Sequence, residues 1–182
     1  MAYSKTHKTA MVIILPSELW PPIQNIRQKY DRQFRRWMPH ITMIYPFRPR
    51  KDFESFLPSF SKALRQIQPL TIHLNRFDYF QHGRQKYTLW LAPEPVDKIA
   101  QLQDALQTVV PDCNEVRKHK SGFTPHLSVG QVSGPKNLQQ VRSSLESTWK
   151  PLSFTLNKVC LISRSDPPDD VFQVVHKVSM GS

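Results

Sequence analysis

Glycine and cysteine are scarce in this 182-residue sequence, which has 5 glycines and 2 cysteines. None of the glycines belongs to a glycine-rich loop of the kind that cradles phosphates. Cys113 and Cys160 are too few for a disulfide framework and have no partners at zinc-binding spacing. A nucleophile elbow of the kind that serine hydrolases carry is also missing. The cysteine usage is typical of a reduced intracellular protein.

Long apolar runs and acidic residues are also in short supply. The longest apolar run, Met11 to Leu15, is far below the roughly 20 residues that span a bilayer, so we expect no membrane association. The polar, basic N-terminus has no apolar region of a secretory signal, so we expect a cytoplasmic location. Lysine and arginine number 25 against 14 acidic residues, a formal net charge of +11. This charge favours an anionic partner, nucleic acid ahead of lipid, with simple solubility as the alternative.

The remaining composition is that of a globular chain, with 39% hydrophobic and 10% aromatic residues. Apolar periodicity predicts helices at 17–34, 52–68, 96–110 and 135–149. It predicts strands at 9–16, 40–47, 70–80, 87–91, 126–132, 152–163 and 171–178. The order reads as two similar halves, each with a Pro-His strand, a helix and further strands. We therefore expect one two-lobed, pseudo-symmetric α+β domain over residues 1–182, as a monomer.

The pattern His-x-Ser/Thr occurs four times, beginning at His7, His40, His119 and His126. The first and third copies lie in polar segments that contain lysine and have no strand signal, so we assign them to solvated loops. The other two read Pro-His-Ile-Thr-Met and Pro-His-Leu-Ser-Val and lie in expected strands. They are 86 residues apart, close to half the chain. Context therefore selects one histidine in each half.

The spacing of the selected motifs has a physical meaning. Residues i and i+2 of a strand point to the same face, so His40 projects with Thr42, and His126 with Ser128. An imidazole can carry a proton near neutral pH, and a hydroxyl can donate a hydrogen bond to a phosphate oxygen. Two such strands around one phosphate would supply an acid, a base and two phosphate ligands without a metal. The alternative is two half-buried structural histidines.

The segments PHITMIYPF and FTPHLSVGQ resemble the paired signatures of the 2H phosphoesterase superfamily, which includes 2′-5′ RNA ligase-like and RNA cyclic phosphodiesterase proteins. The resemblance covers most of the chain. It implies a bilobal α+β fold in which two antiparallel sheets form a central groove with helices outside. It also implies that His40 and His126 are the acid and base, that Thr42 and Ser128 bind phosphate, and that no catalytic metal or other cofactor is used.

Five further residues are candidate substrate contacts: Tyr45, Phe47, Phe123, Lys120 and Arg164. The aromatic members flank the motifs and could stack on a base, with ordinary core positions as the alternative. Strand alternation places Tyr45 on the face opposite Thr42, unless Pro46 introduces a bulge. Lys120 lies in a basic segment before the second motif, where it could steer a polyanion. Arg164 follows an expected strand as a candidate phosphate contact.

The function expected from these features is a metal-independent phosphoesterase that acts on RNA or an oligonucleotide. The substrate is a 2′,3′-cyclic phosphate end or a 2′-5′ linkage, and the sequence does not choose between them. It also leaves open which histidine is the acid. A 2′-5′ RNA ligase and an RNA-end-binding module with little turnover are the alternative functions.

Overall fold

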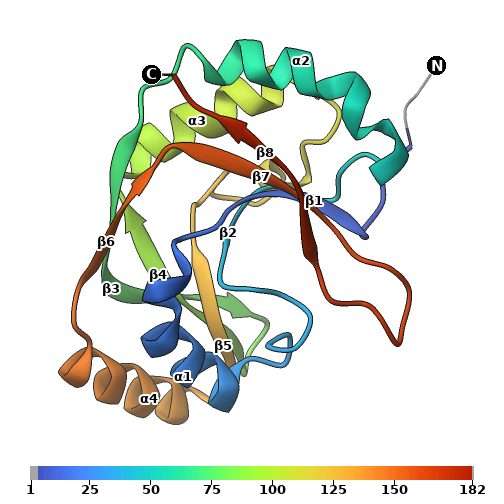
Figure 1. Cartoon of the computed structure of the whole chain (residues 1–182). Coiled ribbons are helices and arrows are strands. Elements are labelled where there is room, and N and C mark those ends of the chain that lie inside the picture. Colours follow the sequence, from blue (N-terminus) through green and yellow to red (C-terminus); the bar gives the residue numbers. More distant parts are fainter. Residues whose placement is uncertain (1–3, 182) are drawn as a thin grey trace.

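The computed structural model describes residues 4–181 and forms two four-stranded antiparallel sheets (Figure 1). The first sheet has the order β2-β1-β7-β8, and the second has the order β5-β4-β3-β6. The strands are β1 (Thr9–Ile13), β2 (Ile41–Ile44), β3 (Leu70–His82), β4 (Lys86–Glu94), β5 (Leu127–Ser133), β6 (Leu152–Leu156), β7 (Lys158–Ser163) and β8 (Gln173–Ser179). The expected α+β class with two antiparallel sheets is confirmed.

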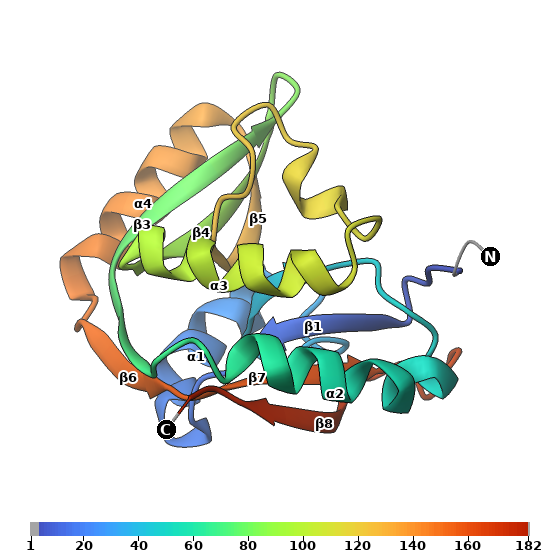
Figure 2. The ribbon, with the colours of Figure 1, turned by 90° about the horizontal axis from the view of Figure 1, so that it is seen from above.

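Four α-helices surround the sheets: α1 (Trp20–Tyr30), α2 (Phe53–Leu64), α3 (Val96–Val109) and α4 (Pro135–Thr148). Helices α2 and α3 pack together at one end of the molecule, and α1 and α4 lie at the other (Figure 1). Figure 2 shows β3, β4 and β5 on one side of α3, and β1, β7 and β8 on the other. Three single-turn helices, η1 (Ser17–Leu19), η2 (Arg50–Asp52) and η3 (Glu115–Arg117), lie in the connections. The described residues contain no helix with the length and apolar character needed to cross a membrane.

The two motif-bearing strands occupy equivalent places. Strand β2 is the edge of the first sheet and β5 is the edge of the second, and the two edges contact each other. Each carries a β-bulge at the residue after its hydroxyl. Thr42 and Ile44 pair with adjacent residues of β1, leaving Met43 as the extra residue, and Val129 is the extra residue in β5. The matched bulges support the expected pseudo-symmetry of the two halves.

The helices cross between the halves. Helix α1 follows β1 in the chain but packs against β5 of the second sheet, and α3 follows β4 but contacts β2 of the first. One cluster of buried side chains, which includes Met11, Leu161, Leu74 and Leu127, therefore extends through both sheets. Because each half covers the motif strand of the other, the relative position of the two edges is fixed by helix packing.

Three expected boundaries are wrong. The expected strand at 152–163 is two strands, since β6 joins the second sheet and β7 the first, and only Asn157 separates them. The expected helix at 17–34 begins at Trp20 and ends at Tyr30, after which residues 32–36 form turns. His40 and His126 each lie one residue before their strand rather than inside it. Hydrophobic periodicity does not distinguish one long strand from two strands that pass between sheets.

Gly130 of β5 lies directly against Tyr30 at the end of α1. A Cβ atom at this position would lie 2.3 Å from Cβ of Tyr30 and 2.9 Å from its carbonyl carbon. We therefore predict that Gly130→Ala lowers the free energy of unfolding by about 3 kcal/mol, at the upper end of overpacking costs. Urea denaturation measures this change. Ser133→Ala, at an exposed position of the same strand, should stay within about 0.5 kcal/mol of wild type. Equal effects of the two substitutions would contradict the close packing of α1 on β5.

Candidate active site

Both motif histidines are held by the same backbone hydrogen bond. Nδ1 of His40 lies 2.7 Å from the carbonyl oxygen of Met38, and Nδ1 of His126 lies 2.8 Å from that of Thr124. A carbonyl oxygen only accepts hydrogen bonds, so Nδ1 is the protonated nitrogen in each neutral ring. Nε2 is then the nitrogen with a free lone pair. Each ring therefore has a defined tautomer, with Nε2 available for proton transfer.

The hydroxyls of the motifs lie on the same faces of the sheets as the histidines. Thr42 pairs across the strands with Val12, which belongs to the same apolar cluster as the ring stacked on His40. Ser128 pairs with Trp90, whose ring contacts His126, so each hydroxyl shares a face with its histidine. We call this side of the two sheets the motif face. Thr42 and Ser128 are both half-buried, while the residues on either side of each are buried. The alternation expected from the sequence is therefore present at both hydroxyls.

Burial lowers the pKa of both imidazoles. The pKa of His40 falls from the ordinary value of 6.5 to about 4, and desolvation is the largest cause. The hydrogen bond to Met38 opposes this shift, whereas the positive charges of Arg27 and His126 add to it. Burial also lowers the pKa of His126, against the effect of its bond to Thr124. Because the charge of His126 acts on His40, the two rings are within electrostatic reach of each other.

Aromatic rings line both histidines. Trp37 stacks on His40 with ring centroids 4.6 Å apart and an interplanar angle of 17°. Phe80 meets His126 edge-on at 4.9 Å, and Trp90 lies 5.9 Å from the same ring. Nε1 of Trp90 is buried and has no hydrogen-bond partner within residues 4–181. These rings cover part of each imidazole and contribute to the desolvation that lowers the pKa values of both histidines.

Trp37 and Phe80 are functional candidates that sequence reasoning missed. The sequence contains a signal for the first, because Trp37-Met-Pro-His40 and Phe123-Thr-Pro-His126 place an aromatic residue three positions before each histidine. Nothing in the sequence marks Phe80, which reaches the second histidine from β3, a strand separated from β5 by β4.

Arg27 fixes the segment that carries Trp37. Its guanidinium is buried, pairs with the carboxylate of Asp31 at 2.8 Å and donates to the carbonyl oxygen of Trp37 at 2.8 Å. Removing one member of a buried ion pair leaves an uncompensated charge, so this pair holds the 31–39 segment tightly. The position of the ring stacked on His40 therefore depends on α1.

Tyr45 lies on the motif face, contrary to the expected strand alternation. It packs with Trp37 at 5.4 Å and belongs to the small apolar cluster formed by Ala10, Val12, Cys160, Ile162 and Phe172. The cause is the bulge at Met43, which shifts the alternation by one residue and turns Ile44 into the main core. The bulge therefore precedes Pro46 rather than arising from it. Burial is the main reason that the pKa of Tyr45 is raised.

The other candidate contacts are dispersed. Phe47 is fully buried in the main core against Phe53 and Phe60, so it does not reach the motif face. Phe123 is partly buried and packs on the edge of the core. Lys120 is exposed in the loop before His126. Arg164 is partly exposed, and its guanidinium lies 5.7 Å from the ring of Phe172.

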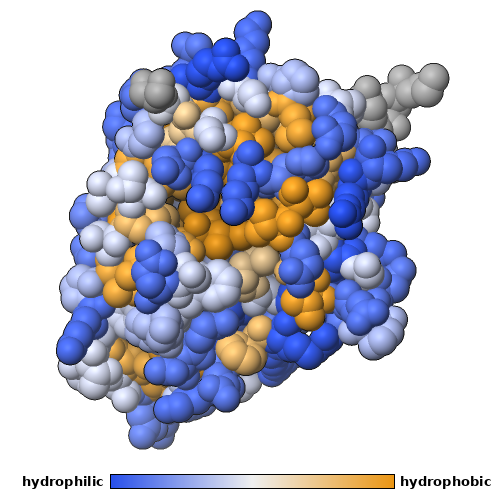
Figure 3. All heavy atoms as spheres, in the orientation of Figure 1, coloured by the Kyte–Doolittle hydropathy of each residue, from blue (hydrophilic) through white to orange (hydrophobic). Residues whose placement is uncertain are grey.

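Apolar side chains gather on one face of the molecule (Figure 3), and a small cavity lies elsewhere on its surface. Figure 3 shows a band of hydrophobic side chains over β1, bordered by hydrophilic ones. A cavity of about 220 Å³ lies at the far end of β4 and β5, lined in part by Arg32, His82, Lys86 and Thr88. In the described part of the chain, no three histidine, cysteine or acidic side chains are grouped so that they could hold a metal ion. The motif face itself presents two imidazoles and two hydroxyls.

Comparison with protein families identifies one match over most of the chain. The model described as "2'-5' RNA ligase superfamily" matches residues 15–168. A "Putative phosphoesterase" of Staphylococcus haemolyticus is 22% identical over 164 residues, which cover 89% of this chain and 93% of that protein. A protein of the same designation from Geobacillus kaustophilus is 27% identical over 128 residues, which cover 68% of this chain and 69% of the relative.

Solved structures match over almost the whole chain. TT0787 of Thermus thermophilus has a TM-score of 0.62 at 20% identity, covering 96% of this chain and 98% of that one. LigT of E. coli in its apo form has a TM-score of 0.62 at 18% identity, covering 98% of this chain and all (100%) of that one. At these identities the likeness establishes the fold.

The low pKa of His40 can be measured directly. In an NMR titration of the imidazole, we predict a midpoint near pH 4 rather than 6.5, and an Nδ1–H tautomer at pH 7. His126→Ala should raise the pKa of His40, because it removes the positive charge that opposes protonation. A midpoint at or above 6.5, or an Nε2–H tautomer, would disprove the buried, carbonyl-bound arrangement.

Proposed function

This chain belongs to the 2′-5′ RNA ligase superfamily, and from that premise we propose that it is a metal-independent phosphoesterase acting on RNA phosphodiesters that involve a 2′-oxygen. His40 and His126 are the proposed acid–base pair, and Thr42 and Ser128 the proposed phosphate ligands. The observation that carries the proposal is the matched geometry of the motifs. Each presents an imidazole with Nδ1 occupied by a backbone carbonyl and Nε2 available, two residues before a half-buried hydroxyl.

Two reactions use this pair in the same way. With a 2′,3′-cyclic phosphate, one neutral imidazole takes a proton from water and the water oxygen attacks phosphorus. The bond from phosphorus to the 3′-oxygen breaks, and the second, protonated imidazole gives its proton to that oxygen. The product is a 2′-phosphate, and the pair ends with its proton on the opposite ring.

With a 2′-5′ linkage, the attacking group is the neighbouring 3′-hydroxyl of the same ribose. One imidazole takes its proton, the 3′-oxygen attacks phosphorus, and the bond to the 5′-oxygen breaks as the other imidazole protonates it. The product is a 2′,3′-cyclic phosphate. Ligation is this second reaction in reverse. In each case Thr42 and Ser128 donate hydrogen bonds to the non-bridging oxygens, where negative charge develops.

The choice of RNA rests on charge and on structural neighbours. The net charge of +11 favours a polyanion, and most of the excess is arginine and lysine on the surface. A LigT of E. coli has been crystallised with 3′-AMP, and a Kluyveromyces marxianus Usb1 of the same fold, with a TM-score of 0.54, with uridine monophosphate. Nucleotide binding by these proteins supports a nucleotide substrate for this chain.

Removing either imidazole should abolish turnover. We predict that His40→Ala and His126→Ala each lower kcat by at least about 10²-fold, since general acid–base groups contribute about 10²–10⁴-fold. The substrates are an oligonucleotide ending in a 2′,3′-cyclic phosphate and a 2′-5′-linked oligoadenylate, both assayed in EDTA.

His119→Ala is the matched control, because His119 has the same three-residue pattern in an exposed loop. Circular dichroism establishes that each variant is folded. Near-normal rates in either motif variant would rule out the two-histidine mechanism, and loss of wild-type activity in EDTA would rule out a metal-free one. Tight binding without turnover of either substrate would indicate an RNA-end-binding protein instead.

The pH dependence follows from the two lowered pKa values. The reacting free enzyme carries one proton on the pair, and this form is most abundant between the two pKa values. The pKa of His40 is about 4 and that of His126 is below 6.5. Activity is lost at low pH as the base becomes protonated and at high pH as the acid loses its proton. We therefore predict a bell-shaped profile of kcat/KM with its maximum below pH 6.5, whichever histidine is the acid. A maximum above pH 7 would contradict this prediction.

A further inference from the structure

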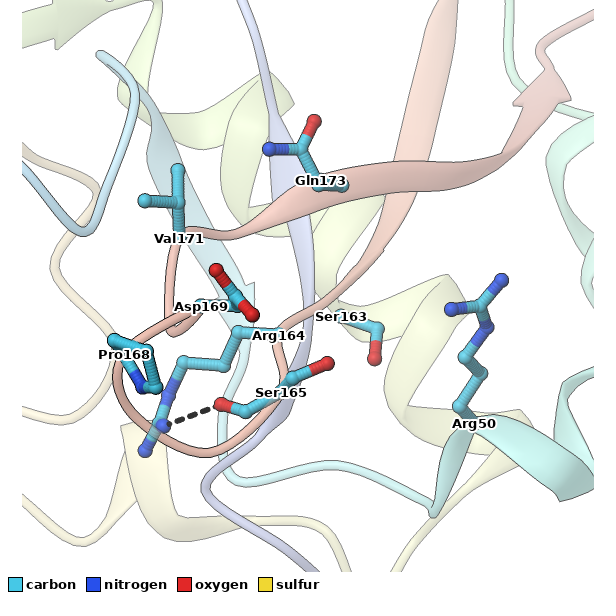
Figure 4. Close-up of a pocket in the computed structure, with 8 residues that line it drawn as sticks. All are labelled: Arg50, Ser163, Arg164, Ser165, Pro168, Asp169, Val171 and Gln173. Atoms are coloured by element: carbon cyan, nitrogen blue, oxygen red, sulfur yellow. Dashed lines mark hydrogen bonds between the residues drawn. The ribbon is translucent and has the colours of Figure 1, made fainter.

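A cavity of about 430 Å³ lies between the η2 turn and the connection from β7 to β8 (Figure 4). This volume is in the range of small-ligand sites. None of the motif residues lines it. In Figure 4, Arg50 lies on the helical side and Arg164 on the strand connection, with Ser163 and Ser165 between them, and the Arg164 side chain extends away from Arg50 towards Pro168.

The walls of this cavity are held in place by buried contacts. Asp170 is fully buried and pairs with Arg35 at 2.5 Å and with Arg36 at 2.6 Å. The hydrogen bond from Arg35 is the main reason that the pKa of Asp170 falls to about 2, so this carboxylate stays charged at neutral pH. The amide of Phe172 also donates to the carbonyl oxygen of Arg36. The β7–β8 connection is therefore fastened to the segment that precedes His40, and the cavity is preformed.

The lining suits a nucleotide. Arg50 is exposed and has no ion-pair partner among residues 4–181. One N–H group of Arg164 donates a hydrogen bond to the carbonyl oxygen of Ser165. Arginines with free donors are the usual partners of phosphate. Pro168 and Val171 provide an apolar surface for a base or ribose. The one acidic residue of the lining, Asp169, leaves the two arginines in excess.

A row of contacts connects this cavity to His40. Trp37 stacks on His40 at 4.6 Å, Phe172 packs on Trp37 at 3.8 Å, and the guanidinium of Arg164 lies 5.7 Å from the Phe172 ring. Tyr45 provides a second connection, since it packs against Trp37, and the charge of Arg164 opposes the rise that burial causes in the pKa of Tyr45. The cavity therefore adjoins the side chains that pack around His40.

We propose that this cavity is a second nucleotide subsite, in which Arg50 and Arg164, on opposite sides of the lining, bind separate phosphates of the strand next to the nucleotide that reacts. The proposal rests on the proposed function and names the substrate class more closely as an oligonucleotide rather than a mononucleotide. An RNA strand reacting at His40 and His126 would pass over the partly exposed ring of Trp37, where a base or ribose can pack, while the buried Phe172 supports that ring from below.

The test compares kcat/KM for a nucleoside 2′,3′-cyclic phosphate with that for a trinucleotide ending in the same group. The wild-type protein should prefer the trinucleotide. Arg164→Gln and Arg50→Gln should each reduce the ratio of trinucleotide to mononucleotide kcat/KM by about tenfold, the loss of one charged hydrogen bond. The slope of log(kcat/KM) against log[salt] for the trinucleotide should also become shallower by about 1.

Arg65→Gln is the matched control, because it removes the same charge from an exposed arginine at the opposite end of α2 from Arg50. An unchanged ratio in both cavity variants, or an equal loss in Arg65→Gln, would overturn the subsite. Arg50 is exposed, so its variant keeps the test valid if Arg164→Gln disturbs the loop.

Failure of the proposed function gives a different result. If neither substrate turns over, binding of a fluorescent trinucleotide 3′-phosphate replaces the rate measurement. Weaker binding in the cavity variants than in Arg65→Gln would support the subsite without the activity, and equal binding would overturn it.

Discussion

The hydrogen bond from each motif imidazole to the carbonyl oxygen two residues earlier is the constraint on which the site depends. Nδ1 of His40 donates to the carbonyl oxygen of Met38, and Nδ1 of His126 donates to that of Thr124. The tautomer and the ring orientation are thereby set by backbone geometry before any substrate is present. Such preorganisation matters because a reactive group misplaced by 1 Å loses much of its effect. The prolines at 39 and 125 lie between each carbonyl and its histidine, where their restricted backbone angle helps to fix the bend.

The sheets bring the two tied imidazoles together by a repeated construction. Each motif strand is a sheet edge, each has its bulge directly after the hydroxyl, and each is covered by the helix of the other half. A bulge increases local twist and redirects the side chains that follow it. The absence of a side chain at Gly130 lets α1 approach β5 closely enough for Asp31 to contact Gln131. On the other side, Gln103 of α3 donates to the carbonyl oxygen of the bulge residue Met43. The crossed helices therefore fix the position of the two bulges, and of the two histidines that precede them, relative to each other.

The sequence predicted those features that follow from the alternation of residues along a strand. It did not predict those that depend on how strands pair or on which sheet they join. The two-residue period of a strand correctly predicted that Thr42 and Ser128 share a face with buried neighbours around them. The same rule failed at Tyr45, because a bulge at Met43 depends on pairing with β1 and has no marker in a single sequence. The division of 152–163 at Asn157 was missed for a similar reason, since the two strands differ in their sheet rather than in their pattern. Phe80 could not be found because its neighbour His126 is 46 positions away in the chain.

Aromatic packing and positive charge have different roles in the proposed function. Positive charge at Arg50, Arg164 and the surface lysines would attract the proposed polyanion over a distance, whereas partial burial against Trp37 and Phe80 lowers the pKa of the imidazoles and favours their neutral forms. The same low-dielectric surroundings make any charge that enters more effective. A bound phosphodiester anion would raise the pKa of the imidazole beside it, so the substrate itself promotes the protonated state that the acid needs. In the proposed reaction, the partial burial of the two rings would therefore favour the neutral imidazole in the free protein and the protonated imidazole once the anion is bound.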